Sequence, residues 1–307
     1  MGMSELNLKV TIAGVEWRNP ITTASGTVNS GKEYSPYIDF NKLGAITSKG
    51  VSAEEWKGSA LPRVTESYGG MISSIGVQNL GVEAFIKNDV PFFRRIDTVS
   101  IINVCGHTIE DYCTVARRLT EAGGVDMLEL NISSPSMPGG PMNIGKDWRS
   151  TEEVVRRVKA ATNLPVIAKL SPNAYDIIEV AKAAEGAGAD ALSLINTLLA
   201  MRIDIERRKP VLGNVFGGLS GPAIKPVAVR SVYQVAQVTK IPIIGMGGIM
   251  RGEDAIEFLL AGATAVAVGT ANFANPRASL DVLAGIEDYM EHHGIEDVND
   301  LIGAALV

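Results

Sequence analysis

Residues 241–270 read IPIIGMGGIMRGEDAIEFLLAGATAVAVGT, and this stretch decides the fold. It opens with a short apolar strand (241–248), continues with a helix-like amphipathic segment (251–261) and ends with a second apolar strand (264–270). The turn Ala261-Gly262-Ala263-Thr264 puts glycine where a helix must end before the next strand begins. Near-continuous apolar strands joined by an amphipathic helix predict a parallel sheet that helices cover on its outer face.

The same strand–helix unit recurs along the chain from about residue 21, and Ala187-Gly188-Ala189-Asp190 repeats the glycine turn. Amphipathic segments such as 108–122 and 174–187 separate the strands. Because no linker or shift in composition divides the units, we predict one domain (1–307) folded as a (β/α)8 TIM barrel rather than two doubly wound halves. The eight predicted strands are ITTASG (21–26), GAITSKG (44–50), TVSIINVCG (98–106), MLELNIS (127–133), VIAKLSP (166–172), ALSLINT (191–197), IPIIGMGG (241–248) and TAVAVGT (264–270).

Segments outside the repeated units also carry expectations. Residues 8–20 predict a small hairpin that closes the amino-terminal side of the barrel. Three long segments, 51–80, 134–149 and 198–221, each follow a strand, so we expect them on the catalytic face. Within the second of these, the proline- and glycine-rich stretch Ser134–Lys146 is interpreted as a mobile lid.

Composition narrows the class of protein. A net charge of −6 offers no basic field for nucleic acid or anionic lipid. With two cysteines and no CxxC motif, we expect no disulfide framework, no self-contained iron–sulfur cluster and no metal site. The start MGMSELNLKV lacks an apolar signal core, and the most hydrophobic stretch, Ala255–Phe273, contains Glu257 and two glycines. We therefore expect a cytoplasmic protein without a membrane span.

Small, polar or cationic residues end every predicted strand. In a barrel these ends line one pocket, whereas the opposite ends mainly serve stability. Asparagine and glycine end strands for structural reasons too, so each position alone is ambiguous, but the eight together predict a functional site. The strand ends are Ser25-Gly26, Lys49-Gly50, Asn103, Asn131, Lys169, Asn196-Thr197, Gly247-Gly248 and Gly269-Thr270.

Two features of this pocket suggest its ligands. The last two glycine pairs allow backbone N–H groups to approach an anion, which is typical of phosphate sites in barrels but does not specify the ligand. Lys169 lies inside an apolar strand, where its charge needs a partner. That partner is either the N1/C2=O edge of a flavin or an acidic residue of the barrel, and Lys49 is open to a similar role or to a substrate carboxylate.

Several motifs together resemble one family, the dihydroorotate dehydrogenases, and within it the catalytic subunits of the NAD-linked class (class 1B). The resemblance runs nearly from end to end, and the stretch from INTLL through AIKP is its most specific part. The motifs are ASGT (24–27), TSKG (47–50), KLSPN (169–173), INTLL (195–199), GGLSGPAIKP (217–226), GMGGI (245–249) and AGATAVAVGTANF (261–273).

The resemblance implies FMN-dependent oxidation of (S)-dihydroorotate to orotate in pyrimidine biosynthesis, with Lys169 beside the flavin. It also implies a homodimer core and a second subunit that carries FAD and a [2Fe–2S] cluster, in a heterotetramer. The alternative is a self-sufficient dimer that passes its electrons to a soluble acceptor. The implied FMN contacts are Ser25, Lys49, Gly50, Asn103, Asn131, Lys169, Ile195, Gly221, Gly247, Gly248, Gly269 and Thr270. The implied substrate contacts are Lys49, Ser73, Ser74, Ile75, Gly76, Val77, Asn131, Ser136, Asn196 and Thr197.

The chain departs from the family pattern beside the expected substrate. Where NAD-linked members carry NxSCPN, this chain has residues 131–136 as NISSPS, and where they carry NAIGL it has 73–77 as SSIGV. Ser134 therefore replaces the cysteine base, as in the quinone-linked class, and we interpret it as the catalytic base.

Loss of two asparagine amides leaves an alternative open, a paralogous flavin oxidoreductase acting on another dihydropyrimidine or cyclic ene. A third hypothesis is a non-redox aldolase or isomerase that binds a phosphosugar, since such barrels share phosphate-binding glycines and a strand-borne lysine.

Overall fold

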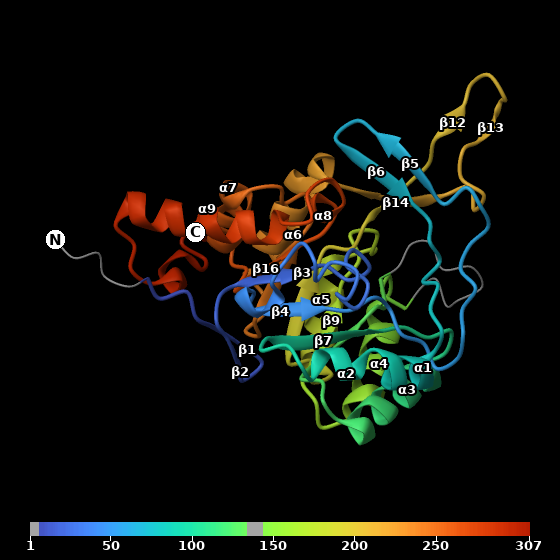
Figure 1. Ribbon diagram of the computed structural model, residues 1–307, viewed down its shortest axis with the longest axis horizontal. Helices are drawn as coiled ribbons and strands as arrows, with labels where there is room; N and C mark the ends of the chain where they lie inside the picture. The colour runs from blue at the N-terminus through green and yellow to red at the C-terminus, as the bar shows by residue number, and fades with distance from the viewer. Residues whose placement is uncertain (1–5, 134–143) are drawn as a thin grey trace.

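The computed structural model describes residues 6–133 and 144–307, and its centre is a parallel barrel. In this part of the chain eight parallel strands hydrogen-bond in the order β3-β16-β15-β10-β9-β8-β7-β4. Figure 1 shows β3, β4, β7, β9 and β16 near the centre of the molecule. Each strand of the barrel lies inside one of the eight predicted strands, and the predicted TIM barrel is confirmed. The strands are β3 (Ile21–Thr23), β4 (Ala45–Thr47), β7 (Val99–Val104), β8 (Met127–Leu130), β9 (Val166–Lys169), β10 (Ala191–Leu194), β15 (Ile243–Met246) and β16 (Ala265–Val268).

The seam between β3 and β4 closes the barrel without a regular ladder. The backbone N–H of Gly44 donates to the carbonyl of Ile21 at 3.0 Å. Further along, the N–H of Thr47 donates to Thr23 Oγ1 at 3.1 Å, and Thr22 Oγ1 lies 3.2 Å from Thr47 Oγ1. Threonine hydroxyls thus supply hydrogen bonds that a continuous strand pairing would have supplied.

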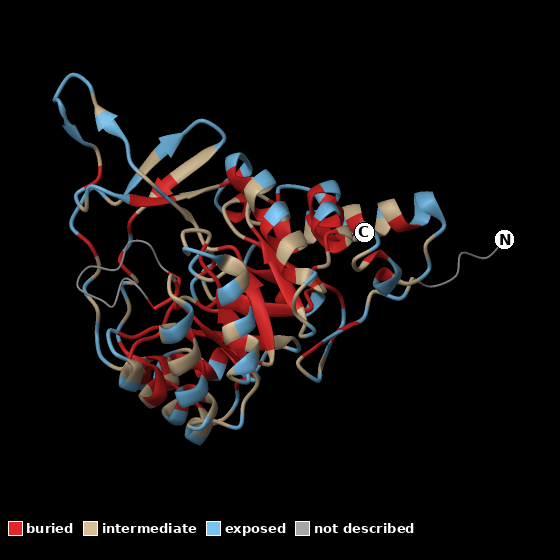
Figure 2. Cartoon of the chain, turned by 180° about the vertical axis from the view of Figure 1, so that it is seen from behind, coloured by how far each residue is buried: buried red, intermediate tan, exposed pale blue. Residues whose placement is uncertain are grey.

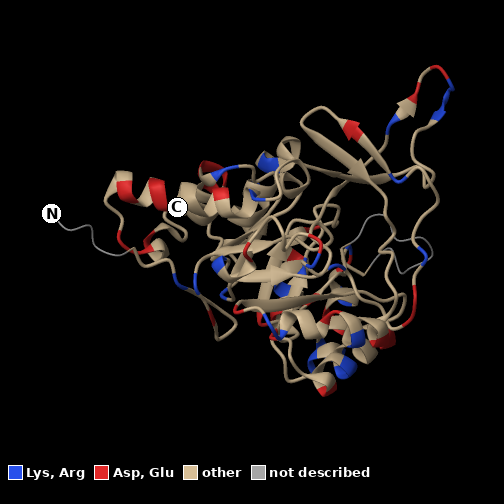
Figure 3. Ribbon diagram, viewed as in Figure 1, with Lys and Arg blue, Asp and Glu red and all other residues tan. Residues whose placement is uncertain are grey.

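Helices cover the barrel because each buries one apolar stripe. In α4, for example, Val154, Val155 and Val158 are fully buried, whereas Arg156 and Arg157 are exposed. Figure 2 shows the buried residues concentrated in the barrel strands, and Figure 3 shows much of the charge on the surrounding helices. The helices are α1 (Val82–Asn88), α2 (Val90–Phe93), α3 (Ile109–Ala122), α4 (Trp148–Lys159), α5 (Ile177–Gly186), α6 (Lys225–Ala236), α7 (Gly252–Leu260), α8 (Ala271–Ala274) and α9 (Ala278–His293), with 3-10 turns η1 (Phe40–Lys42), η2 (Pro222–Ile224) and η3 (Val298–Leu301).

The expected amino-terminal hairpin is present as β1 (Val10–Ile12) and β2 (Val15–Trp17), which pair antiparallel. Val10, Ile12 and Trp17 are buried, whereas Thr11 and Glu16 are exposed, so one face of the hairpin packs into the core. Asn19, directly after it, accepts hydrogen bonds from the N–H groups of Ile21 and Gly44 at 3.2 and 2.9 Å. The hairpin is therefore fastened to the starts of two neighbouring barrel strands.

Two of the predicted long loops contain a second sheet. Segments 51–80 and 198–221 supply four antiparallel strands in the order β11-β14-β6-β5, which we call the upper sheet. The strands are β5 (Val64–Ser67), β6 (Gly70–Ser73), β11 (Leu198–Ala200) and β14 (Gly217–Ser220), and the small hairpin β12 (Ile203–Asp204) and β13 (Lys209–Pro210) projects beyond them (Figure 1).

The hydrophobic stretch at the carboxyl-terminal end of the barrel forms α7 and the buried strand β16, as the sequence predicted. Among the residues that the structure describes, no helix combines the length and the apolar character that crossing a membrane requires.

Candidate active site

A cavity of about 570 Å³ opens at the carboxyl ends of the barrel strands. Residues after the barrel strands form one side of it, and Met71, Ser73 and Ser220 of the upper sheet line it as well. Its volume lies within the range that small-molecule and cofactor sites occupy. The upper sheet thus adds a second wall to the site at the open end of the barrel.

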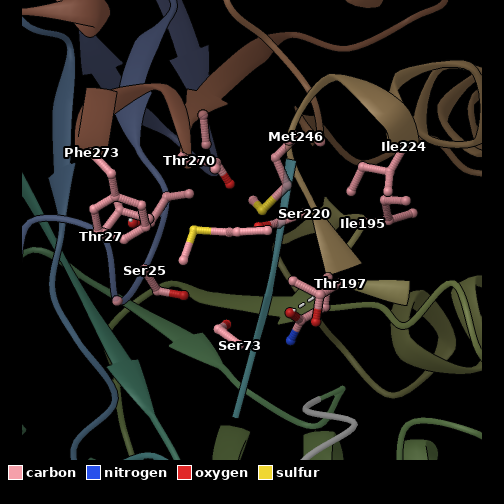
Figure 4. Close-up of a pocket in the computed structure, with 18 of the residues that line it drawn as sticks. Ser25, Thr27, Ser73, Ile195, Thr197, Ser220, Ile224, Met246, Thr270 and Phe273 are labelled. Atoms are coloured by element: carbon pink, nitrogen blue, oxygen red, sulfur yellow. Dashed lines mark hydrogen bonds between the residues drawn. The ribbon is translucent and has the colours of Figure 1, made fainter. Parts of the chain in front are cut away.

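The structure brings most of the predicted site residues together around this cavity. All twelve residues predicted to contact FMN line it, as do Ser73, Ile75, Gly76, Val77, Asn196 and Thr197 from the predicted substrate set. Figure 4 shows Ser25, Thr197 and Thr270 around the same space, although they come from different barrel segments.

Ser74 is the predicted substrate contact that the structure describes away from the lining of the cavity. It is fully buried, its hydroxyl accepts a hydrogen bond from Asn214 Nδ2 at 3.1 Å, and it donates to Ser59 Oγ at 3.5 Å. Its hydroxyl therefore bonds within the surrounding loops, and its role as a substrate contact stays a prediction. Ser134 and Ser136, with most of the predicted lid, lie outside the described residues.

Lys169 has an acidic partner in the barrel, one of the two alternatives that its apolar strand left open. Its Nζ donates to Ser25 Oγ at 2.9 Å and lies 3.5 Å from Glu129 Oε1. Both charged side chains are almost completely buried. Because an ammonium carries three N–H donors, the two contacts leave one for a ligand in the cavity that Lys169 lines.

Glu129 also anchors a chain of amides beneath the cavity. Its Oε1 accepts from Asn103 Nδ2 at 2.6 Å, and its Oε2 accepts from Ser193 Oγ at 2.7 Å. Asn103 Oδ1 in turn accepts from Asn131 Nδ2 at 3.2 Å, and Asn131 Oδ1 accepts from Asn196 Nδ2 at 3.4 Å. The amide planes at three strand ends are therefore fixed relative to one another, which fixes the donors and acceptors that they offer to a ligand.

Asn173 holds the turn that carries Asn196 and Thr197. Its Nδ2 donates to the carbonyl of Thr197 at 3.0 Å, and its Oδ1 accepts from the N–H of Leu199 at 3.0 Å. Asn196 Oδ1 accepts from the N–H of Thr197 at 2.8 Å, and Asn196 Nδ2 donates to Ser133 Oγ at 3.0 Å. Asn173 lies within the motif KLSPN, but this role was not predictable from the sequence, since Thr197 and Leu199 lie more than twenty residues further along the chain.

Lys49 is half-buried and faces the cavity. Burial lowers the pKa of its ammonium, the positive charge of Arg63 lowers that pKa further, and Glu33 opposes both effects. Within the described part of the chain its Nζ has no hydrogen-bond or ion-pair partner. A cation with a lowered pKa and no protein partner, placed in a cavity, is typical of a group that binds an anion.

The segments that follow β15 and β16, which contain glycines, present backbone N–H groups to the cavity. Gly247 and Gly248 adopt φ values of 127° and 82°, a region that favours glycine. A Cβ at Gly248 would lie 2.9 Å from the backbone nitrogen of Lys225, so no side chain fits there. Within the described residues the N–H groups of Gly248, Gly269 and Thr270 donate to no protein acceptor. Unsatisfied N–H groups lining a cavity fit the phosphate of a nucleotide such as FMN.

The sequence model of one family, described as dihydroorotate dehydrogenase, matches residues 7–290. The chain belongs to the dihydroorotate dehydrogenase family. Two relatives named dihydroorotate dehydrogenase B (NAD(+)), catalytic subunit, support this. The one from Alkaliphilus oremlandii is 58% identical over 98% of this chain and 99% of the relative. The one from Lachnoclostridium phytofermentans is 55% identical over 97% and 99%.

A solved dihydroorotate dehydrogenase shares the fold. The crystal structure of the enzyme from Eimeria tenella, in complex with ferulenol, superposes with a TM-score of 0.83 and covers 99% of this chain and 90% of its own. Its sequence is 20% identical, so this likeness shows the barrel alone. Dihydroorotate dehydrogenases are FMN-dependent oxidoreductases of pyrimidine biosynthesis, and membership of this family argues against the hypothesis of a non-redox phosphosugar enzyme.

Proposed function

We propose that this chain oxidises (S)-dihydroorotate to orotate with FMN held in the described cavity. The observation that carries the proposal is the set of free N–H groups at Gly248, Gly269 and Thr270, because they suit a phosphate group. Lys169 supports it too, since its ammonium reaches the cavity from the barrel interior and supplies positive charge there. FMN, when bound, accepts the hydride at N5.

The chain's own residues bind and orient the substrate in this proposal. Lys49 has no protein partner within the described residues, so its ammonium is available for the substrate carboxylate. The amides of Asn131 and Asn196 and the hydroxyl of Thr197 line the same cavity and offer hydrogen bonds to a pyrimidine ring. The two asparagine amides are hydrogen-bonded to each other, so their positions are fixed before a ligand binds. Binding of the ring therefore costs little side-chain entropy.

Ser134 is the proposed base that removes a proton from C5 of the substrate. The structure does not describe it, and the support is its place in the chain. It follows Ser133, whose hydroxyl accepts a hydrogen bond from Asn196 Nδ2 at 3.0 Å beside the cavity. Ser136 remains a proposed substrate contact on the resemblance alone.

A second candidate is oxidation of another dihydropyrimidine or cyclic ene. The observation in its favour is Ser73, which lines the cavity where related enzymes carry asparagine. A serine hydroxyl is shorter than an asparagine amide and offers fewer hydrogen bonds, so dihydroorotate would lose a contact worth about 1–3 kcal/mol.

The partner proposal rests on the relatives, whose name as catalytic subunits implies a separate subunit in those proteins. We assign to this chain a homodimer core and an electron-transfer subunit with FAD and a [2Fe–2S] cluster, in a cytoplasmic heterotetramer. Exposed apolar side chains around the upper sheet support a protein interface there. They include Leu61, Tyr68 and Ile205, which are 78%, 101% and 80% exposed.

Anaerobic stopped-flow measurement of flavin reduction tests the activity. The purified protein is expected to be yellow and to bleach with dihydroorotate, whereas the product orotate, as control, leaves the colour unchanged. Ser134→Ala is expected to slow bleaching by about two or more orders of magnitude, the usual scale for a lost general base. No bleaching at millimolar dihydroorotate would favour the second candidate, and a colourless protein that takes up no FMN would refute both.

A further inference from the structure

Lys169 and Glu129 form a buried ion pair behind the cavity. Among the described residues three Asp, Glu, Lys or Arg residues are buried: Lys169, Glu129 and Asp254. Charges inside a protein are costly to desolvate, and at short range they act through a low effective dielectric. A pair kept at this place in the barrel therefore has a strong effect on whatever lies in front of it.

Lys169 and Glu129 differ in their access to the cavity. Lys169 and Asn103 line the cavity, but Glu129 does not. Glu129 accepts from Asn103 Nδ2 at 2.6 Å and from Ser193 Oγ at 2.7 Å, and it lies 3.5 Å from Lys169 Nζ. These contacts come from three neighbouring strands, so the carboxylate is fixed from several sides. Any influence of Glu129 on a bound ligand thus passes through its neighbours or through its charge.

We infer that Glu129 is a positioning residue that sets the reduction potential of FMN by partly cancelling the charge of Lys169. This rests on the proposed function, in which Lys169 supplies positive charge to the flavin. Positive charge beside the N1/C2=O edge favours reduced over oxidised flavin. A carboxylate within the same ion pair weakens that preference. Glu129 therefore lowers the potential, and it also holds the Lys169 ammonium and the Asn103 amide in place.

Glu129→Gln tests this inference because glutamine keeps the shape and one acceptor while removing the charge. FMN bound to E129Q is expected to have a higher midpoint potential than in the wild-type protein, measured by anaerobic titration against a reference dye. The ratio of FMN dissociation constants, oxidised over reduced, should rise by about tenfold, which equals about 30 mV for a two-electron couple. Glu129→Asp keeps the charge but withdraws it by one methylene, so a smaller rise is expected.

Ser193→Ala is the matched control, since it removes a hydrogen bond to the same carboxylate and leaves every charge in place. It is expected to lower the thermal unfolding temperature without moving the potential. If E129Q does not fold, E129D carries the test alone. A wild-type potential in every folded Glu129 variant would overturn the inference, even while wild-type protein is yellow and bleaches with dihydroorotate. A wild-type protein without FMN would instead overturn the proposed function.

Discussion

At the scale of single residues, the proposed contact between Lys49 and the substrate carboxylate predicts that substrate binding depends on pH. Burial, followed by the charge of Arg63, lowers the pKa of its ammonium, so the positive charge is lost at a lower pH than for an ordinary lysine. Because the substrate carboxylate needs that charge, we expect KM for dihydroorotate to rise with pH through the lowered pKa. Lys49→Met is expected to raise KM by about 10- to 100-fold at neutral pH, the scale of a lost charged hydrogen bond, and to remove this pH dependence.

Glu33 provides the control for that assignment. Its negative charge raises the pKa of Lys49, so Glu33→Gln should lower that pKa further and move the rise in KM to lower pH. Glu33 is exposed, and its one hydrogen bond, from Asn29 Nδ2 at 2.8 Å, suits a glutamine oxygen equally well. Steady-state KM measured against pH for the three proteins decides the matter. A profile identical in wild type and Lys49→Met would assign the titration to another group.

Some residues of the site were predictable from the sequence and others were not. The strand-end residues were predictable because parallel strands of a barrel all end on one face, whatever their neighbours are. Glu129 was not, since one acidic residue in MLELNIS does not reveal that a lysine forty residues later faces it. The burial of Ser74 was not predictable either, since the period of a strand gives no information about a loop, where Asn214 Nδ2 donates a hydrogen bond to its hydroxyl.

At the scale of elements, the turn after β10 depends on Asn173. Asn173→Ala removes both hydrogen bonds that fix residues 197–199, to the carbonyl of Thr197 and from the N–H of Leu199. We expect the free energy of unfolding to fall by about 1–3 kcal/mol for the unpaired backbone groups. Dihydroorotate KM should rise, because Asn196 and Thr197 lose their fixed positions, while FMN content stays normal. Urea unfolding, steady-state kinetics and absorbance at 450 nm measure the three quantities.

Asn173→Asp separates the two hydrogen bonds. Aspartate still accepts from the N–H of Leu199, but it places a carboxylate oxygen against the carbonyl oxygen of Thr197, so the free energy of unfolding is expected to fall at least as far as in Asn173→Ala. A normal KM in Asn173→Ala together with reduced stability would restrict the residue to a structural role.

The upper sheet was not predicted from the sequence, which indicated only long loops over its residues. Its strands are three or four residues long, and they pair across the molecule, as Ile72 with Leu219. Gly217 and Gly218 allow close packing here, because a Cβ at Gly217 would lie 2.8 Å from the carbonyl oxygen of Ser73 and one at Gly218 would lie 2.0 Å from Thr197 Oγ1. Such pairing depends on the barrel that brings both loops to one face, and no local propensity records it.

At the scale of the whole molecule, the barrel was predictable because its eight units repeat one local strand–helix pattern. The cysteine content of the chain bears on a different question, its ability to hold an iron–sulfur cluster. The only cysteines are Cys105 and Cys113, both buried, and burial raises the pKa of each thiol. Two such thiols do not provide the four ligands that a [2Fe–2S] cluster requires. In the proposed heterotetramer the [2Fe–2S] cluster is therefore assigned to the electron-transfer subunit.

We accordingly expect the isolated chain to complete only half of an NAD-linked reaction. With dihydroorotate it should bleach and reduce a soluble dye continuously, because a small dye enters the open cavity mouth where Phe273 is 52% exposed. With NAD+ as sole acceptor it should form less than one equivalent of NADH per flavin, followed at 340 nm. Addition of an electron-transfer subunit with FAD and a [2Fe–2S] cluster should restore turnover, with that subunit alone as the control. Sustained NADH formation by the isolated chain would show that electrons leave without a partner and would remove the proposed heterotetramer.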